Sequence, residues 1–444
     1  MYINSFLLSK NFVNVPTLNF LSFLRKCMQF TKKLIPFLVL LSSQQAFATD
    51  GYFAHGYGVK SQGMGGVGIA LPQDALAAAS NPAGLGLVGD RIDIGATWFR
   101  PIRETEITGN LAGPAVNGTY GANETKDFII PEFGYNRQIN PDITLGVSVY
   151  GNGGMNTDYS KPVPLLGTSP AGIDLIQLFV APTVTWRITP SNILGVSLNL
   201  AYQRFEAKGL ENFAASNPYS TAGDSVTNKG HDNSYGAGLH VGWIGQLNDT
   251  VTLGATYQSK TYMSKFDKYK GLFAEGGDFD IPETYGIGIA VKATPQLTVA
   301  ADVQRINYSD VASVGNLSLY NLGNGLGSNN GAGFGWRDVT ALKLGASYAL
   351  NENLTLRTGY NHSTQPIRSG ETMFNILAPG VVQDHLTLGA TWVLENKGEL
   401  SVSYVHAFEN SINGSNSIPT AYGSGEANLK MYQDALGVAY GWKI

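Results

Sequence analysis

The sequence predicts an all-β transmembrane protein: a single antiparallel β-barrel of about 14 strands in an outer membrane, with its lumen plugged by a small amino-terminal segment. Three observations predict this class. Charged residues make up only 14% of the 444 residues, against about 25% in ordinary globular domains. Many segments alternate apolar and polar residues with a period of two, and no apolar run after the amino terminus is long enough for a membrane helix.

The amino terminus predicts export from the cytoplasm. The basic pair Lys32-Lys33, a short apolar run and an Ala-x-Ala site at 46–48 are typical of a secretory signal, so we expect residues 1–48 to be removed. A second methionine, Met28, stands where such a signal normally begins. Residues 1–27 are therefore either a longer basic region or an upstream start that is never used.

Loss of this signal excludes several classes of function. It removes five Lys and Arg residues and no acidic ones, so the formal net charge falls from −4 to −9, which argues against a nucleic-acid partner. It also removes Cys27, the only cysteine. Disulfides, thiolate metal sites, a cysteine nucleophile and a lipid anchor on cysteine are excluded with it.

Period-two alternation defines the strands. Residues 251–257 (VTLGATY) place Val, Leu, Ala and Tyr on one face and Thr, Gly and Thr on the other. Residues 342–348 (LKLGASY) and 386–392 (LTLGATW) repeat the pattern. Each apolar face ends in Tyr or Trp, as expected where an amphipathic ring lies at a lipid–water boundary.

Applied to the whole chain, this criterion predicts fourteen strands. They are expected near 91–101, 127–138, 143–150, 175–188, 193–206, 234–246, 251–262, 281–293, 297–308, 339–349, 354–361, 384–394, 399–406 and 430–444.

The connections between these strands alternate strictly in length. Six are short turns with Asn, Asp, Pro or Gly, such as 140–142, and seven are long and polar, such as 207–233. Outer-membrane barrels have the same asymmetry, with short periplasmic turns and both termini in the periplasm. The last strand is similar to those that barrel-assembly machinery recognises, although it ends in Ile444 where Phe is usual.

The 42 residues between the signal and the first strand, 49–90, are too many for a turn and too few for an independent domain. They are rich in small residues that allow tight backbone packing. A barrel of this size has a lumen that its own side chains do not fill. We therefore expect 49–90 to be a plug and 91–444 to be the barrel, with Asn81-Pro82-Ala83 ending a short helix inside the lumen.

The plug sequence also carries a family resemblance. Residues 50–85, DGYFAHGYGVKSQGMGGVGIALPQDALAAASNPAGL, resemble the amino-terminal hatch of the FadL/TodX family of outer-membrane transporters, with its Asn-Pro-Ala motif. The resemblance implies passive uptake of hydrophobic molecules, which are long-chain fatty acids in one branch and aromatic hydrocarbons in another. It also implies lateral release to the membrane through a gap made by a kinked third strand.

Two sets of residues are candidates for that function. Gly151, Gly153 and Gly154 follow the third predicted strand, where they either kink it or simply begin a loop. Lys343 and Arg357 lie on neighbouring strands and face away from the apolar stripe. They are expected either to meet a fatty-acid carboxylate or to pair with carboxylates of the lumen.

The sequence gives little support to other functional classes. Residues 63–68 match Gly-x-Gly-x-x-Gly, but no apolar strand precedes them, so we assign these glycines to packing. The six histidines have no metal-ligand spacing, and no Gly-x-Ser-x-Gly motif is present, so neither a metal, a cofactor nor an enzyme is expected. A general porin or an adhesin barrel is the remaining alternative, against which the long segment 49–90 argues. The sequence does not distinguish fatty acid from aromatic hydrocarbon.

Overall fold

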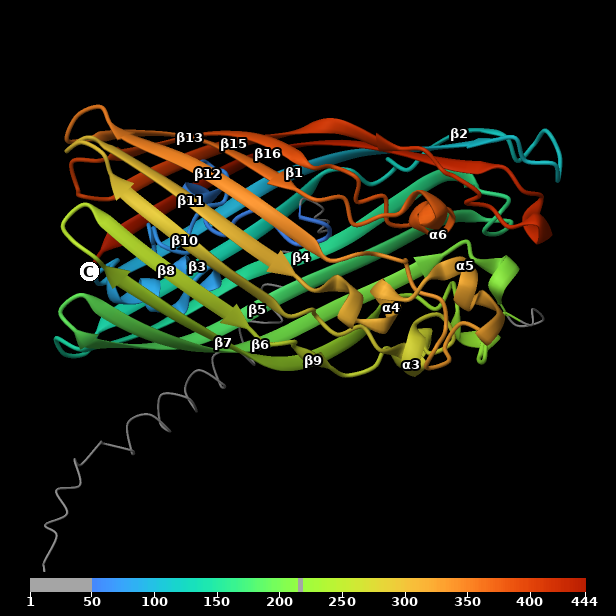
Figure 1. Cartoon of the computed structure of the whole chain (residues 1–444), viewed down its shortest axis with the longest axis horizontal. Coiled ribbons are helices and arrows are strands. Elements are labelled where there is room, and N and C mark those ends of the chain that lie inside the picture. Colours follow the sequence, from blue (N-terminus) through green and yellow to red (C-terminus); the bar gives the residue numbers. More distant parts are fainter. Residues whose placement is uncertain (1–49, 215–218) are drawn as a thin grey trace, which may run out of the picture. The chain divides into compact units, whose positions relative to one another are not determined.

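The computed structural model describes residues 50–214 and 219–444 (Figure 1). The predicted signal, residues 1–48, lies outside this part. A single antiparallel sheet closes on itself, because β1 (Arg91–Thr108) pairs with β16 (Glu426–Lys443) along its whole length. Fourteen strands form the closed ring. The predicted fold class, a 14-stranded antiparallel barrel, is confirmed.

Every predicted strand is present. The barrel strands after β1 are β3 (Phe128–Gln138), β4 (Ile143–Pro162), β5 (Pro170–Thr189), β6 (Asn192–Lys208), β7 (Asp232–Gln246), β8 (Val251–Gln258), β10 (Thr284–Lys292), β11 (Leu297–Ile306), β12 (Val339–Ala349), β13 (Leu354–Ser363), β14 (Asp384–Val393), β15 (Glu399–Ile412) and β16. Two short strands were not expected: β2 (Gly118–Gly121) pairs with β1, and β9 (Tyr262–Met263) pairs with β7.

Several strands are longer than predicted, always at the long-loop end. β1 reaches Thr108 instead of 101, β4 reaches Pro162 instead of 150, and β15 reaches Ile412 instead of 406. These extensions carry charged residues on the outward face, such as Glu104 and Glu106 of β1. An apolar stripe is required only where the wall meets lipid, so alternation of hydrophobicity does not mark the strand beyond that level.

The apolar stripe faces outward, as the alternation predicts. Leu344 of β12 and Leu388 of β14 are 44% and 53% exposed, and the rings at the ends of their stripes, Tyr348 and Trp392, are also exposed. The short turns lie at one end of the barrel and the long loops at the other (Figure 1). Within residues 50–214 and 219–444, no helix combines the length and apolar character needed to cross a bilayer.

All helices of the described chain are short, and they lie either before β1 or in the long loops. They are α2 (Val59–Gln62), η1 (Ala77–Ala79) and η2 (Pro82–Gly86) before β1, and η3 (Glu211–Phe213), η4 (Gly223–Ser225), η5 (Asp267–Tyr269), α3 (Ala274–Gly277), η6 (Tyr308–Asp310), α4 (Ala312–Gly315), α5 (Ser318–Asn321), η7 (Leu322–Asn324), η8 (Ser369–Glu371), α6 (Thr372–Asn375) and η9 (Thr420–Tyr422) in the loops.

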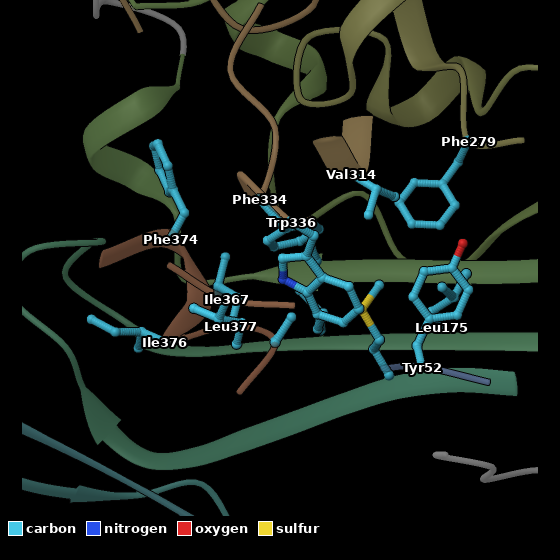
Figure 2. Close-up of a cluster of buried hydrophobic side chains, with 14 of the residues drawn as sticks. Tyr52, Leu175, Phe279, Val314, Phe334, Trp336, Ile367, Phe374, Ile376 and Leu377 are labelled. Atoms are coloured by element: carbon cyan, nitrogen blue, oxygen red, sulfur yellow. The ribbon is translucent and has the colours of Figure 1, made fainter. Parts of the chain in front are cut away.

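The hydrophobic core lies inside the barrel, where the long loops meet the amino-terminal segment. Figure 2 shows Trp336 at its centre, with Phe374 and Leu377 on one side and Phe279 on the other. The Trp336 ring lies 5.8 Å from that of Tyr52, which precedes the barrel in sequence. The long loops are therefore folded into the lumen, and their apolar side chains pack against one another in the half of the barrel nearest these loops.

Candidate functional site in the barrel lumen

Residues 50–90 lie inside the barrel (Figure 1). The amide of Gly65 donates to the Thr387 hydroxyl on β14 over 2.8 Å, and the Asn81 side chain donates to the Trp243 carbonyl on β7 over 3.0 Å. Because β7 and β14 are six strands apart in a ring of fourteen, the segment reaches across the lumen. We refer to residues 50–90 as the plug.

Glycines of the wall make this close contact possible. A Cβ atom added to Gly195 would lie 2.2 Å from the Ala83 nitrogen, and one added to Gly254 would lie 2.2 Å from the Ile69 oxygen. Both glycines follow a leucine that faces lipid. The same Leu-Gly step, with the glycine against the plug, occurs at 145–146, 194–195, 253–254, 344–345, 388–389 and 436–437.

Carboxylates of the wall accept hydrogen bonds from the plug backbone. Asp302 of β11 accepts from the amides of Gly68 and Ile69 over 2.7 and 3.0 Å. Glu132 of β3 and Asp93 of β1 bond amides of the plug in the same way. These contacts satisfy buried N–H groups in a segment with little secondary structure of its own.

The two predicted lumen cations also hold the plug. The Lys343 ammonium donates to the His55 carbonyl over 2.7 Å and lies 3.3 Å from an Asp50 carboxylate oxygen. The Arg357 guanidinium donates to Gln73 over 2.8 Å. Lys343 faces Asn361 across the ladder, four residues from Arg357, so the structure does not bring the two cations together.

For Lys343 this geometry favours the alternative of pairing with a carboxylate of the lumen. The role of both residues in binding a ligand carboxylate stays a prediction.

The Asn-Pro-Ala motif both ends one helical turn and begins another. η1 ends at Ala79, and Asn81 then caps η2, whose first residue is Pro82. The Asn81 carboxamide is fully buried; its oxygen accepts from the Ala83 amide, and its nitrogen donates to the carbonyls of Ile69 and Trp243. One side chain thus joins two parts of the plug to β7.

A buried histidine adds a titratable group to this interface. The ring of His55 stacks on His385 of β14 at 5.6 Å. Burial, and then the neighbouring His385, lower the pKa of His55 to about 3. His55 is therefore neutral at physiological pH. Among the described residues, no group of three or more His, Cys, Asp and Glu side chains is arranged to hold a metal ion.

The wall is interrupted between β3 and β4. Their ladder ends at the pair Phe133–Val149, whereas β3 continues to pair with β1 as far as Phe128. Nearer the long-loop end, β4 pairs again with the loop before β3. Asn123 forms a parallel bridge with Asp158, and the Glu124 amide donates to the Asp158 carbonyl. Between these closures, no backbone pairing of the described chain connects 130–132 of β3 to 150–155 of β4. We call this break the window.

The plug occupies the unpaired edge of β4 at the window. Phe53 forms an antiparallel bridge with Gly153, the Gly154 amide donates to the Tyr52 carbonyl, and the Ala54 amide donates to the Asn152 carbonyl. A Cβ atom at Gly153 would lie 2.1 Å from the Tyr52 oxygen, so this approach requires glycine.

The three predicted glycines lie within β4 and not in a loop. The strand does not end at Tyr150, because β4 continues to pair with β5 on its other side up to Pro162. Between Gly151 and Gly153 the register shifts by one residue, and this bulge bends the strand. The glycines thus mark the place where β4 leaves β3 and turns to the plug.

Three apolar cavities lie in the lumen. The outer cavity lies between the long loops and is lined by Phe205, Phe273 and Phe334 among others. The middle cavity is lined by Trp336 and by Phe99 of β1. The inner cavity shares Phe99 and lies beside residues 54–56 of the plug.

Sequence reasoning missed two signals in this site. The repeated Leu-Gly steps place a glycine on the lumen face of six strands, which indicates where a backbone packs against the wall. Pro131 lies within β3 at the window, and proline is confined to positions where a strand lacks a partner on one side.

These features define a transmembrane β-barrel whose lumen is filled by its own amino-terminal segment and long loops. A family model described as "Outer membrane protein transport protein (OMPP1/FadL/TodX)" matches residues 39–443. The chain therefore belongs to this family and is an outer-membrane transporter of hydrophobic compounds.

Solved structures share the fold at low sequence identity. The P. putida toluene transporter TodX has a TM-score of 0.65 and 17% identity, covering 88% of this chain and 99% of that one. A Pseudomonas aeruginosa FadL homologue has a TM-score of 0.66 and 15% identity, covering 88% and 98%. An inferred outer membrane protein of Neisseria meningitidis serogroup B is 22% identical, covering 90% of this chain and 97% of the relative.

Proposed function

We propose that this protein mediates passive uptake of hydrophobic small molecules, foremost long-chain fatty acids, and releases them sideways into the outer membrane through the window. The window between β3 and β4 is the observation that carries this proposal. In a transmembrane barrel an interrupted ladder leaves backbone groups without partners, which is costly in lipid. Here residues 52–54 of the plug supply those partners on the β4 side, so a movement of these residues opens the wall.

The three cavities suggest the route. The outer and middle cavities adjoin, since Phe334 and Leu377 line one and Trp336 and Ala378 line the other. The middle and inner cavities share Phe99. Both edges of the window border this route, because Met155 of β4 lines the middle cavity and Ile130 of β3 lines the inner one.

In this proposal residues 49–90 form the hatch and 91–444 form the barrel. The long loops face the cell exterior, and both termini lie in the periplasm. The plug need not leave the barrel for transport. Its first residues, 52–54, only have to release the edge of β4, because the window lies beside them and the remaining plug contacts lie deeper in the lumen.

Two other functions remain as alternatives. Uptake of aromatic hydrocarbons follows the same route, and the solved toluene transporters share the fold. A general porin needs a continuous aqueous channel, which the packed plug and loops argue against.

The substitution Gly153→Trp tests lateral release. An added Cβ atom at this position would lie 2.1 Å from the Tyr52 oxygen, so the indole displaces residues 52–54 from the edge of β4 and itself fills the gap that they leave. The control is Gly121→Trp in β2, where the nearest atom to an added Cβ is a side-chain nitrogen at 3.8 Å. Uptake of radiolabelled oleate and of toluene is measured in a Gram-negative host that lacks other transporters of this kind.

We expect Gly153→Trp to reduce uptake of both compounds several-fold, while Gly121→Trp transports normally. The heat-dependent mobility of the folded barrel in a detergent gel controls for insertion. Normal uptake by a correctly folded Gly153→Trp protein would exclude the window as the exit.

A further inference from the structure

One charged side chain lines the middle cavity. Of the ten described residues around this cavity, nine are uncharged, including Phe99, Met155, Trp336 and Met431, and the tenth is Arg103 of β1. The cavity therefore combines apolar walls with a single cation.

Arg103 is buried without a carboxylate partner. Its side chain is among the largest fully buried ones, with 1% exposure. Its guanidinium donates to the carbonyl and carboxamide oxygens of Asn156 and to the carbonyl of Thr125, which are all neutral acceptors. The Nε–H group is buried and has no acceptor.

The other buried cations of the described chain, Lys60, Arg91 and Lys343, have carboxylate partners. Arg91 contacts Asp93 and Glu399, and Lys343 contacts Asp50. Removal of a guanidinium from water is energetically costly unless a counter-charge and hydrogen bonds replace the solvent. At Arg103 the neutral acceptors satisfy three of the five N–H donors, and no carboxylate contacts the guanidinium. The charge of Asp158 acts on Arg103 only from a distance, and Asp158 itself pairs with Lys208.

A carboxylate completes this site. It is an acceptor that matches a guanidinium in charge and geometry, and such pairs form strong hydrogen bonds. An apolar tail on the same molecule fits the aromatic and thioether side chains around the cation.

We propose that Arg103 binds the carboxylate of a long-chain monocarboxylic acid and thereby makes the transporter select fatty acids over uncharged hydrocarbons. This inference rests on the proposed uptake function and adds the substrate's head group to it. Arg103 contacts Asn156, which follows Met155 on the window edge of β4. In this proposal the head group lies on the long-loop side of the window, and the tail extends past Phe99 into the inner cavity.

The test compares two ligands that differ in the head group alone. Radiolabelled oleate and oleyl alcohol are titrated against the purified full-length barrel in a neutral detergent. The variants are Arg103→Gln, which removes the charge, and Arg103→Lys, which keeps it. The matched control is Arg100→Gln, since Arg100 is 40% exposed, lies on the same strand and pairs with Asp127.

For the native protein we expect oleate to bind at least about tenfold more tightly than oleyl alcohol, because hydrogen bonds to charged groups are the stronger class. Arg103→Gln is expected to abolish this preference by weakening oleate alone. Arg103→Lys retains part of it, and Arg100→Gln retains all of it. Heat-dependent gel mobility confirms that each variant is folded.

Three results overturn the inference: no preference in the native protein, equal weakening of both ligands by Arg103→Gln, or no effect of Arg103→Gln on oleate. Its failure is distinct from failure of the proposed function. If oleyl alcohol and toluene are taken up and oleate shows no preference over oleyl alcohol, only the role of Arg103 is wrong. If none of the three compounds is taken up, the uptake function itself is wrong.

Discussion

At the scale of single residues, the polar groups of the wall serve mainly as partners for the plug. Period-two alternation places Lys343 and Arg357 on the face opposite the apolar stripe, and the structure shows both in contact with the plug. The alternation did not identify their partners, since these are backbone groups or side chains of an aperiodic segment. Alternation within a strand reports which face a residue occupies, whereas the partner across the lumen depends on how the plug packs against many strands at once.

The ion pair of Lys343 provides the first prediction. Lys343→Met leaves the Asp50 carboxylate buried without a cation, which costs about 3–5 kcal/mol. We expect faster amide hydrogen exchange in plug residues 50–57, measured by mass spectrometry. Lys292→Met, at an exposed position of β10, is the control and should leave the exchange unchanged. Native exchange together with a selective loss of oleate binding would assign Lys343 to the ligand instead.

The second prediction concerns pH. His55 has an ordinary pKa of 6.5 and a folded-state pKa of about 3. The open plug therefore binds more protons between these values, so the contribution of His55 to plug docking is complete above about pH 6.5 and is lost as the pH falls toward 3. Asp50, Lys343 and His385 face the same region.

We expect the native protein in planar bilayers to leak ions more often at pH 4.5 than at pH 7.5. His55→Gln, which does not titrate, should show a weaker pH dependence. An identical pH dependence in the two proteins would show that another group controls docking.

At the scale of elements, strand identity was predictable and strand length was not. All fourteen strands follow from alternation because lipid on one side and packed polar groups on the other impose it. Strand residues outside the part of the wall that faces lipid are not marked by this alternation. They include the extensions of β1, β4 and β15 and the short strands β2 and β9. The glycines of β4 left a bend and the start of a loop as alternatives. The pairing of the free edge of β4 with the plug was not predictable, because the residues involved are about 100 positions apart.

The third prediction concerns η2, which the sequence predicted only as the end of a helix. Asn81→Ala removes the N-cap and the donor to two buried carbonyls. Loss of a cap costs about 0.5–2 kcal/mol, so protection of the Ala83 and Gly84 amides should fall by about twofold to thirtyfold. Asn324→Ala, an exposed loop position, is the control. Unaltered protection in Asn81→Ala would mean that the cap does not hold η2 in place.

At the scale of the whole molecule, the barrel and its contents are complementary. The wall carries glycine where the plug backbone approaches it, and the long loops fill the upper lumen with aromatic side chains. An open aqueous pore requires neither of these features. Both fit a barrel that excludes water and ions while passing apolar molecules through small cavities.

The most direct test of this account is the ion conductance of the protein in planar bilayers, with and without residues 51–88. The native barrel should be nearly silent. The deletion variant should show large, steady conductance steps, because the deletion empties the lumen at the short-turn end and also removes Tyr52 and Phe53 from the core that packs the long loops. Heat-dependent gel mobility verifies that the variant barrel has closed. A large steady conductance of the native protein, or silence of a correctly folded deletion variant, would contradict the account.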